Sequence, residues 1–136
     1  MGTKFWQIYR IVKMIEVPRS PLAATYLRFL QLARTIQALP DGLAMDANES
    51  ALLEAIVVRW YEDNPMTVRE AINLTALGSP ATLHKRISRL REKDLLSNFN
   101  LDGDKRAKYL VPTTRTLEYF NQLGRTMHEV QVVPRA

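Results

Sequence analysis

The chain has 136 residues, no cysteine and a formal net charge of +5, with 46% hydrophobic and 24% charged residues. This composition is typical of one globular domain, and the lack of cysteine excludes a disulfide framework, a thiolate metal site and a redox thiol. Residues 1–66 hold seven Lys or Arg and seven Asp or Glu, whereas residues 67–136 hold twelve and seven. An excess of positive charge confined to one half favours a nucleic-acid-binding module, although it also aids solubility.

Residues 1–19 form an apolar N-terminal segment in which Phe5, Ile8, Tyr9 and Val12 recur at helical spacing. Three interpretations remain open for this segment: a helix in a dimer seam, a segment packed on its own domain, or a mobile or membrane-grazing tail. No apolar run approaches the about 20 residues of a membrane span, and no signal-peptide pattern is present. We therefore expect no membrane span, and the lack of cysteine suits a protein of the reducing cytoplasm.

Two helices are predicted next. Residues 20–45 contain a helix that starts at Ser20-Pro21 and ends near Leu39, followed by a linker with the turn Pro40-Asp41-Gly42. Asp46 to Glu49 fits a capping box at the start of a second helix, which stops before Pro65. This second helix is apolar over a wide arc and should be the central core helix, with the side chains Leu52, Leu53, Ile56, Val57 and Trp60.

The following stretch has the order of a helix-turn-helix. Thr67 to Glu70 is a second capping box, for a helix of about two turns, and Gly78 suits a tight turn. Ser79-Pro80 then starts a helix over residues 79–92 whose aliphatic stripe is Leu83, Ile87 and Leu90. Its other side carries small and hydroxyl residues first and cations later, as a groove-reading helix requires. Taken alone, this helix is equally well an amphipathic helix with a solvated basic face.

A hairpin and a last helix complete the chain. Residues 96–101 and 107–111 are predicted to pair around an Asp102-Gly103 turn, which carries Lys105 and Arg106 on its tip. The alternative for this tip is a charged turn that only aids solubility. From Thr113 or Thr114, a final helix is predicted with an apolar stripe of Leu117, Tyr119, Phe120, Leu123 and Met127.

From about Ser50 to Gln122 the sequence resembles the MarR-type winged-helix transcription regulators. The similar motifs are Pro80-Ala81-Thr82-Leu83-His84-Lys85, Arg89-Leu90-Arg91-Glu92-Lys93-Asp94-Leu95-Leu96, Asp102-Gly103-Asp104-Lys105-Arg106-Ala107-Lys108 and Leu110-Val111-Pro112-Thr113. Several positions depart from the family pattern. Asp94 stands where the family usually has glycine, Lys105 replaces the first of two arginines, and the wing tip is one residue shorter.

The expected fold is mostly α with a small β-hairpin, an α+β winged helix-turn-helix whose N- and C-terminal helices form a dimerisation layer. Residues 46–112 are the predicted DNA-binding domain, and 113–136 the C-terminal helix and tail. Helix 79–92 should enter the major groove of double-stranded DNA and the wing, 101–108, should lie at the minor groove. The predicted contacts are Ser79, Ala81, Thr82, Lys85, Arg86, Arg89, Lys105, Arg106 and Lys108. Lys85 and Arg86 are expected to be exposed.

The predicted function is a homodimeric, sequence-specific transcription regulator. Two alternatives remain: a winged helix that binds another protein, or a non-regulatory DNA-binding protein of architectural, replication or mobile-element type. Neither a metal-ligand cluster nor a phosphate loop occurs, so no enzymatic activity and no cofactor are predicted. His84 is interpreted as a surface histidine or a phosphate contact. The resemblance implies a small-molecule effector site between the dimer layer and the winged domain, but no residue cluster marks it.

Overall fold

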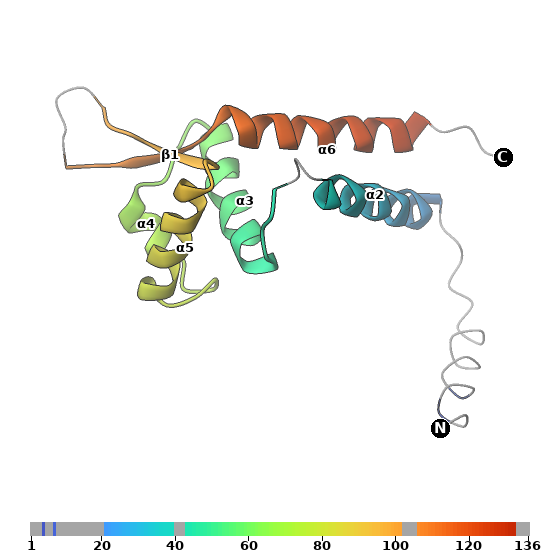
Figure 1. Cartoon of the computed structure of the whole chain (residues 1–136), viewed down its shortest axis with the longest axis horizontal. Helices are drawn as coiled ribbons and strands as arrows, with labels where there is room; N and C mark the ends of the chain where they lie inside the picture. Colours follow the sequence, from blue (N-terminus) through green and yellow to red (C-terminus); the bar gives the residue numbers. More distant parts are fainter. Residues whose placement is uncertain (1–3, 5–6, 8–20, 40–42, 102–105, 133–136) are drawn as a thin grey trace.

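The computed structural model describes residues 4, 7, 21–39, 43–101 and 106–132. Most of segment 1–19, the Ser20 start, the turn 40–42 and the wing tip with Lys105 therefore lie outside the described residues. The elements in chain order are α2 (Pro21–Ala38), α3 (Ala47–Tyr61), α4 (Val68–Ile72), α5 (Pro80–Glu92), β1 (Leu96–Phe99), β2 (Tyr109–Pro112) and α6 (Thr114–Val132). This order confirms the predicted fold class, helical with one small hairpin. In Figure 1, α3, α4, α5 and the hairpin gather at one end, and α6 runs away from them beside α2.

Side-chain caps begin α3 and α4 at the predicted residues. The Asp46 carboxylate accepts from the Glu49 N–H at 2.7 Å, and Thr67 Oγ1 accepts from the Glu70 N–H at 3.1 Å. At α4 the capping box is complete, because the Glu70 carboxylate also accepts from the Thr67 N–H. At α3 the Glu49 carboxylate pairs instead with the Lys93 Nζ at 2.7 Å. The half of the predicted capping box in which Glu49 reaches back to the start of α3 is therefore wrong. A buried carboxylate gains more from a cation than from one N–H.

The stability that the α4 cap contributes depends on pH through the charge of the Glu70 carboxyl. Burial raises the pKa of its carboxyl, but hydrogen bonds from Thr67 and Arg59 lower it more, so the net pKa lies below the ordinary 4.5. A pKa lowered in the folded state means that the carboxylate stabilises the fold above about pH 4.5. This stabilisation is lost as the pH falls through the folded-state pKa.

Replacing Thr67 by alanine should lower the free energy of unfolding by about 1 kcal/mol, because the cap of α4 is removed. Urea denaturation at pH 7 measures this loss, and Thr75→Ala, at an exposed threonine in the turn after α4, is the control. The difference between the two variants should shrink as the pH falls through the folded-state pKa of Glu70, because the protonated carboxyl no longer accepts from the Thr67 N–H. Equal stability of both variants at pH 7 would show that the cap is not needed.

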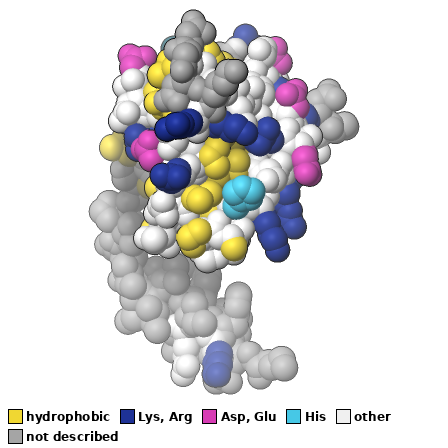
Figure 2. All heavy atoms as spheres, turned by 90° about the vertical axis from the view of Figure 1, so that its left-hand side faces the viewer, with side chains coloured by type: hydrophobic (Ala, Val, Ile, Leu, Met, Phe, Trp, Pro, Cys, Tyr) yellow, Lys and Arg dark blue, Asp and Glu magenta, His cyan; other side chains and the backbone are white. Residues whose placement is uncertain are grey.

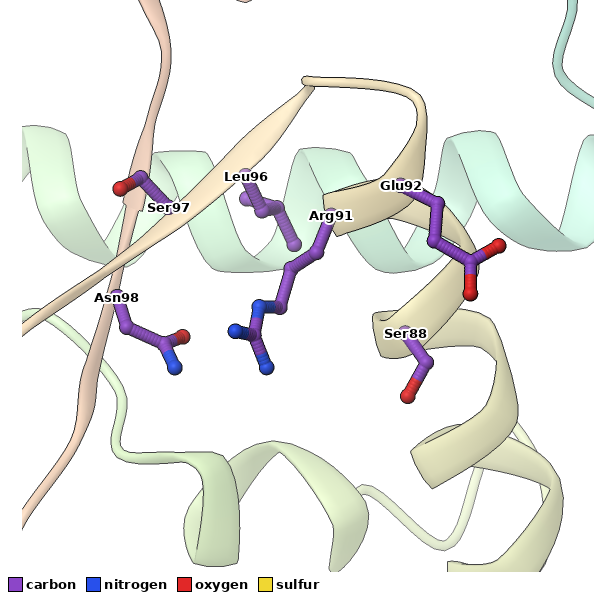
Figure 3. A pocket seen from close by; sticks show the side chains of 6 residues that line it. All are labelled: Ser88, Arg91, Glu92, Leu96, Ser97 and Asn98. Carbon is purple, nitrogen blue, oxygen red and sulfur yellow. The ribbon is translucent and has the colours of Figure 1, made fainter.

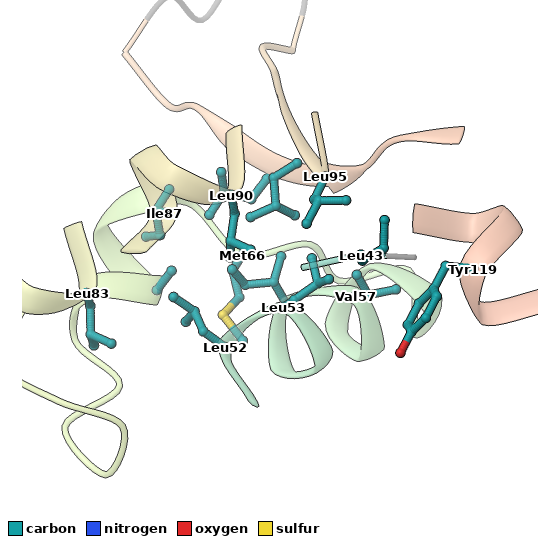
Figure 4. Packing of buried hydrophobic residues seen from close by; sticks show 14 residues of the cluster. Leu43, Leu52, Leu53, Val57, Met66, Leu83, Ile87, Leu90, Leu95 and Tyr119 are labelled. Carbon is teal, nitrogen blue, oxygen red and sulfur yellow. The ribbon is translucent and has the colours of Figure 1, made fainter. Parts of the chain in front are cut away.

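The core forms where α5 packs on α3. Figure 4 shows Leu83, Ile87 and Leu90 pointing from α5 toward α3, as their i, i+4, i+7 spacing predicts. All three are buried, and each stabilises the fold by about 1.5–3 kcal/mol relative to an exposed position. The predicted core residues of α3 are also buried, with Trp60 half-buried at the edge. This packing fixes which side of α5 faces the solvent.

The hairpin is attached to α4 as well as to itself. β1 and β2 pair antiparallel, with Leu96 opposite Pro112 and Phe99 opposite Tyr109. Both strands differ slightly from the prediction, because β1 ends two residues early and β2 starts two residues late. Residues 107 and 108 were predicted to belong to the second strand and pair with the first. Instead, the Lys108 carbonyl accepts from the Val68 N–H of α4 at 3.0 Å. The root of the wing is thereby held beside the first residues of α4.

The end of α5 is bonded to the start of α6. Asp94 adopts a φ of 60°, the left-handed conformation for which the MarR pattern has glycine. Three consecutive carbonyl groups, of residues 93–95, accept hydrogen bonds from side chains at the start of α6. The pairs are Arg115 Nη1 to Lys93 O (2.8 Å), Thr113 Oγ1 to Asp94 O (2.7 Å) and Thr116 Oγ1 to Leu95 O (2.6 Å). These bonds satisfy carbonyls that the turn leaves without helical partners.

Helices α2 and α6 lie side by side in a layer next to the core (Figure 1), and Tyr119 of α6 belongs to the core cluster. Gln37 Nε2 donates to the Tyr119 hydroxyl at 2.9 Å, which joins the two helices. Of the apolar stripe predicted for α6, Tyr119 is buried while Leu117 and Met127 are exposed, and Thr116, Thr126 and Val130 are buried as well. The layer thus keeps large apolar side chains on its surface, namely Leu22, Tyr26, Leu27, Leu117 and Met127.

Candidate nucleic-acid interface

The N-terminus of α5 exposes two linked hydroxyl groups. Ser79 Oγ accepts from the Thr82 N–H at 3.3 Å and donates to Thr82 Oγ1 at 2.9 Å. Pro80 occupies the first helical position, where no N–H partner is needed. Ser79 and Ala81 are exposed and Thr82 is half-buried. The side chains at this end of the helix are therefore small, and two of them carry hydroxyl groups. Another macromolecule can approach the helix closely here.

The solvent side of α5 continues with cations. Lys85 and Arg89 are both exposed, one turn apart, and the half-buried Ser88 lies between them. Because Leu83, Ile87 and Leu90 occupy the opposite side, the exposed face is cationic and the buried face aliphatic, as predicted. His84 is also exposed.

Arg86 differs from the prediction of full exposure. Its side chain is half-buried, and Nη1 donates to the Leu77 carbonyl at 2.8 Å. Gly78 makes room for this contact: it has a φ of +153°, and a Cβ there would lie 3.2 Å from the Arg86 Nη1. The guanidinium therefore fastens the turn between α4 and α5 to the second turn of α5.

The charge of Arg86 also acts on the start of α3. The pKa of Asp46 lies below its ordinary value, chiefly because the Glu49 N–H donates to the carboxylate, and the nearby Arg86 charge lowers it further. Arg86 thus interacts with the turn through a hydrogen bond and with Asp46 through its charge.

The root of the wing supplies two further exposed cations. Arg106 and Lys108 are exposed, and both line a hollow of about 410 Å³ together with Thr67, Val68 and Arg69 of the α4 start. The hydrogen bond from Val68 to the Lys108 carbonyl holds the two sides of this hollow together. Lys105, the remaining predicted wing cation, lies outside the described residues.

Two arginines of this region were not predicted. Arg69 is exposed on α4 next to the wing root, and Arg91 is exposed near the end of α5. In the sequence, Arg69 lies within the capping box of α4, a pattern that predicts a helix start but no role in binding. Arg91 falls between the two faces of the α5 wheel, so helical periodicity alone assigns it no side.

Figure 2 shows the end of the molecule that carries the wing, α4 and α5. Lys and Arg side chains form a band across this face, with hydrophobic side chains and a histidine beneath it. Within the described part of the chain, no group of three or more His, Asp or Glu is arranged to hold a metal ion. None of the described helices is long and apolar enough to cross a membrane.

A short helix, a glycine-containing turn, a helix with one cationic face and a two-stranded hairpin follow one another in this structure. This succession defines a winged helix-turn-helix fold. It is the fold that the resemblance to MarR-type regulators implies.

No protein-family model matches the chain, and no curated protein matches its sequence. Solved structures do match. The chain is similar to RV1404 from Mycobacterium tuberculosis, with 16% identity and a TM-score of 0.54 over 83% of this chain and 76% of that one. It is also similar to S. aureus MepR in a complex with DNA, with 13% identity and a TM-score of 0.50 over 93% and 86% of the two chains. The transcriptional regulator Tm0710 from Thermotoga maritima shares 16% identity and a TM-score of 0.50, over 93% and 75%. At these identities the comparisons show a common fold.

Proposed function

We propose that the protein is a sequence-specific, double-stranded DNA-binding transcription regulator of the MarR type. The observation that carries the proposal is the orientation of α5, which buries its aliphatic side and exposes Ala81, Lys85 and Arg89. Arg106 and Lys108 of the wing root are exposed as well. MepR, which shares the fold, has been solved bound to DNA, and this supports the same use of the fold here.

In the proposed complex, α5 enters the major groove with its N-terminus first. The small residues Ser79, Ala81 and Thr82 allow close approach, and Lys85 and Arg89 contact base edges and phosphates. The wing, residues 101–108, lies at the adjacent minor groove, where long cations are attracted by the negative potential. Its contacts are Lys105, Arg106 and Lys108.

The proposed active form is a homodimer that binds DNA without a catalytic step or a cofactor, in the cytoplasm. Residues 46–112 bind the DNA, while 20–45 and 113–136 form the dimer layer. The apolar side chains exposed on α2 and α6 support this arrangement, since a large exposed apolar patch marks an interaction surface. A symmetric dimer would bind half-sites about one helical turn apart.

Selection from a random duplex library tests the proposal directly. The protein should enrich a pseudo-palindromic site, and the logarithm of its binding constant should fall linearly with the logarithm of the salt concentration as counterions are released. No binding at low salt would favour a winged helix that docks on a protein. Binding without enrichment would favour a non-regulatory DNA-binding protein.

Lys85→Ala should weaken binding to the selected duplex by about tenfold, because it removes one exposed cation from the groove face. Fluorescence anisotropy measures the affinity. Arg125→Ala is the matched control, since it removes one exposed charge from α6, which runs away from the wing (Figure 1). If both variants bind as tightly as the unaltered protein, α5 is not the reading helix.

A further inference from the structure

A crevice of about 500 Å³ separates the C-terminal half of α5 from the first strand of the wing. Its lining residues are Ser88, Arg91, Glu92, Leu96, Ser97 and Asn98. Figure 3 shows Arg91 and Asn98 pointing toward one another across it, Arg91 from α5 and Asn98 from β1. Glu92 points away from both. The crevice is therefore polar, and its only inward-pointing charge among these lining residues is a guanidinium.

Asn98 brings an unused acceptor to this crevice. Its Oδ1 is buried and has no hydrogen-bond partner among the described residues. A buried acceptor without a donor is unfavourable, so it favours any arrangement that brings a donor to it. The Arg91 guanidinium, with five N–H groups in a planar fork, is the donor that faces it (Figure 3).

Arg91 is available for this contact and for a second one. It is exposed, and no ion pair or hydrogen bond within the described ranges holds its guanidinium. The Ser88 hydroxyl, by contrast, donates to the His84 carbonyl at 3.1 Å, so its hydrogen is already used. Arg91 is therefore the group in the crevice best suited to bind an anion. One edge of its fork can donate to Asn98 while the other donates outward.

The position of the crevice identifies the anion. In a duplex, neighbouring major and minor grooves are separated by one sugar-phosphate strand. A helix in the major groove and a wing at the adjacent minor groove must straddle that strand, and the crevice lies between those two elements. We propose that the crevice receives the DNA backbone between the two grooves. Arg91 is the phosphate contact and Asn98 the positioning residue that orients its guanidinium, an inference that rests on the proposed function.

A phosphate contact predicts an effect that does not depend on sequence. Arg91→Ala should weaken binding to the selected duplex and to a scrambled duplex by the same factor, about tenfold, and should reduce the salt slope by about one, the share of a single phosphate. Arg91→Lys should keep the salt slope of the unaltered protein, because the positive charge remains. Its affinity should lie between those of Arg91→Ala and the unaltered protein, because lysine lacks the planar fork of N–H groups. Glu92→Gln should bind both duplexes more tightly, since it removes a negative charge from the crevice rim.

A double-mutant cycle tests the role of Asn98. Asn98→Ala should weaken binding several-fold in the unaltered protein and have no effect in the Arg91→Ala variant, because it acts only through Arg91. A merely structural role of Asn98 would give the same loss in both backgrounds. Melting temperatures of all variants are measured alongside, and Arg125→Ala is the control for loss of a remote charge.

Three results would overturn the proposal. A larger loss on the selected than on the scrambled duplex would make Arg91 a base-reading residue. An unchanged affinity and slope for Arg91→Ala would show that the crevice stays empty. Absence of duplex binding by the unaltered protein would remove the proposed function and this inference together. The first two results contradict only the role of Arg91 and leave the proposed function intact. Failure of this inference can therefore be distinguished from failure of the proposed function.

Discussion

Arg86→Ala is expected to lower both the free energy of unfolding, by about 1–3 kcal/mol, and the affinity for DNA, by about tenfold or more. The half-buried guanidinium donates to the Leu77 carbonyl at 2.8 Å, and alanine leaves that carbonyl without this donor. The turn at Gly78 would then no longer be fixed to α5 by this hydrogen bond. Because the turn sets the entry of α5, DNA binding falls with stability.

Lys85→Ala separates the two effects of Arg86→Ala. Lys85 precedes Arg86 in the same helix and carries the same charge, but it is exposed, so its removal should change the free energy of unfolding by less than about 0.5 kcal/mol. Urea denaturation and anisotropy titration of both variants give the comparison. If Arg86→Ala weakens DNA binding but leaves stability unchanged, Arg86 is a direct DNA contact and its bond to the turn contributes little.

Lys93→Met should destabilise the protein by about 3 kcal/mol. Lys93 Nζ donates to Glu49 Oε2 at 2.7 Å and to the Ala44 carbonyl at 2.8 Å, and the Glu49 side chain is only 6% exposed. Methionine keeps an unbranched side chain that is slightly shorter, but it leaves a buried carboxylate without its cation. The 37% exposure of Lys93 places the loss at the lower end of the range for buried pairs.

The double variant Lys93→Met/Glu49→Leu is the control for this prediction. It removes both charges and replaces them with apolar groups, so most of the lost stability should return. Chemical denaturation of the single and double variants gives the coupling energy between the two side chains. A coupling energy near zero would show that the ion pair does not hold the first turn of α3 against the end of α5.

The elements that the sequence predicts well are those specified by neighbouring residues. Thr67 and Glu70 are three positions apart, as are Ser79 and Thr82, so their hydrogen bonds need no knowledge of the rest of the chain. The aliphatic stripe of α5 is equally local, because helical geometry alone places Leu83 and Ile87 on one side. The class of fold follows from the order of such elements.

The features that the sequence does not predict depend on partners brought close by folding. Glu49 fits a capping box until Lys93, 44 positions away, supplies a stronger partner. Arg86 fits an exposed groove contact until the turn places the Leu77 carbonyl beside it. Arg91 becomes a candidate site residue only when β1 returns alongside α5 and brings Asn98 opposite it.

The bonded corner between α5 and α6 has a mechanical consequence. Since the carbonyls of residues 93–95 are each held by a side chain at the start of α6, direct hydrogen bonds join the end of α5 to the start of α6. A tilt of α6 must therefore carry α5 with it. Anything that pushes on the far half of α6, or on α2 lying against it, would change the direction in which Lys85 and Arg89 point.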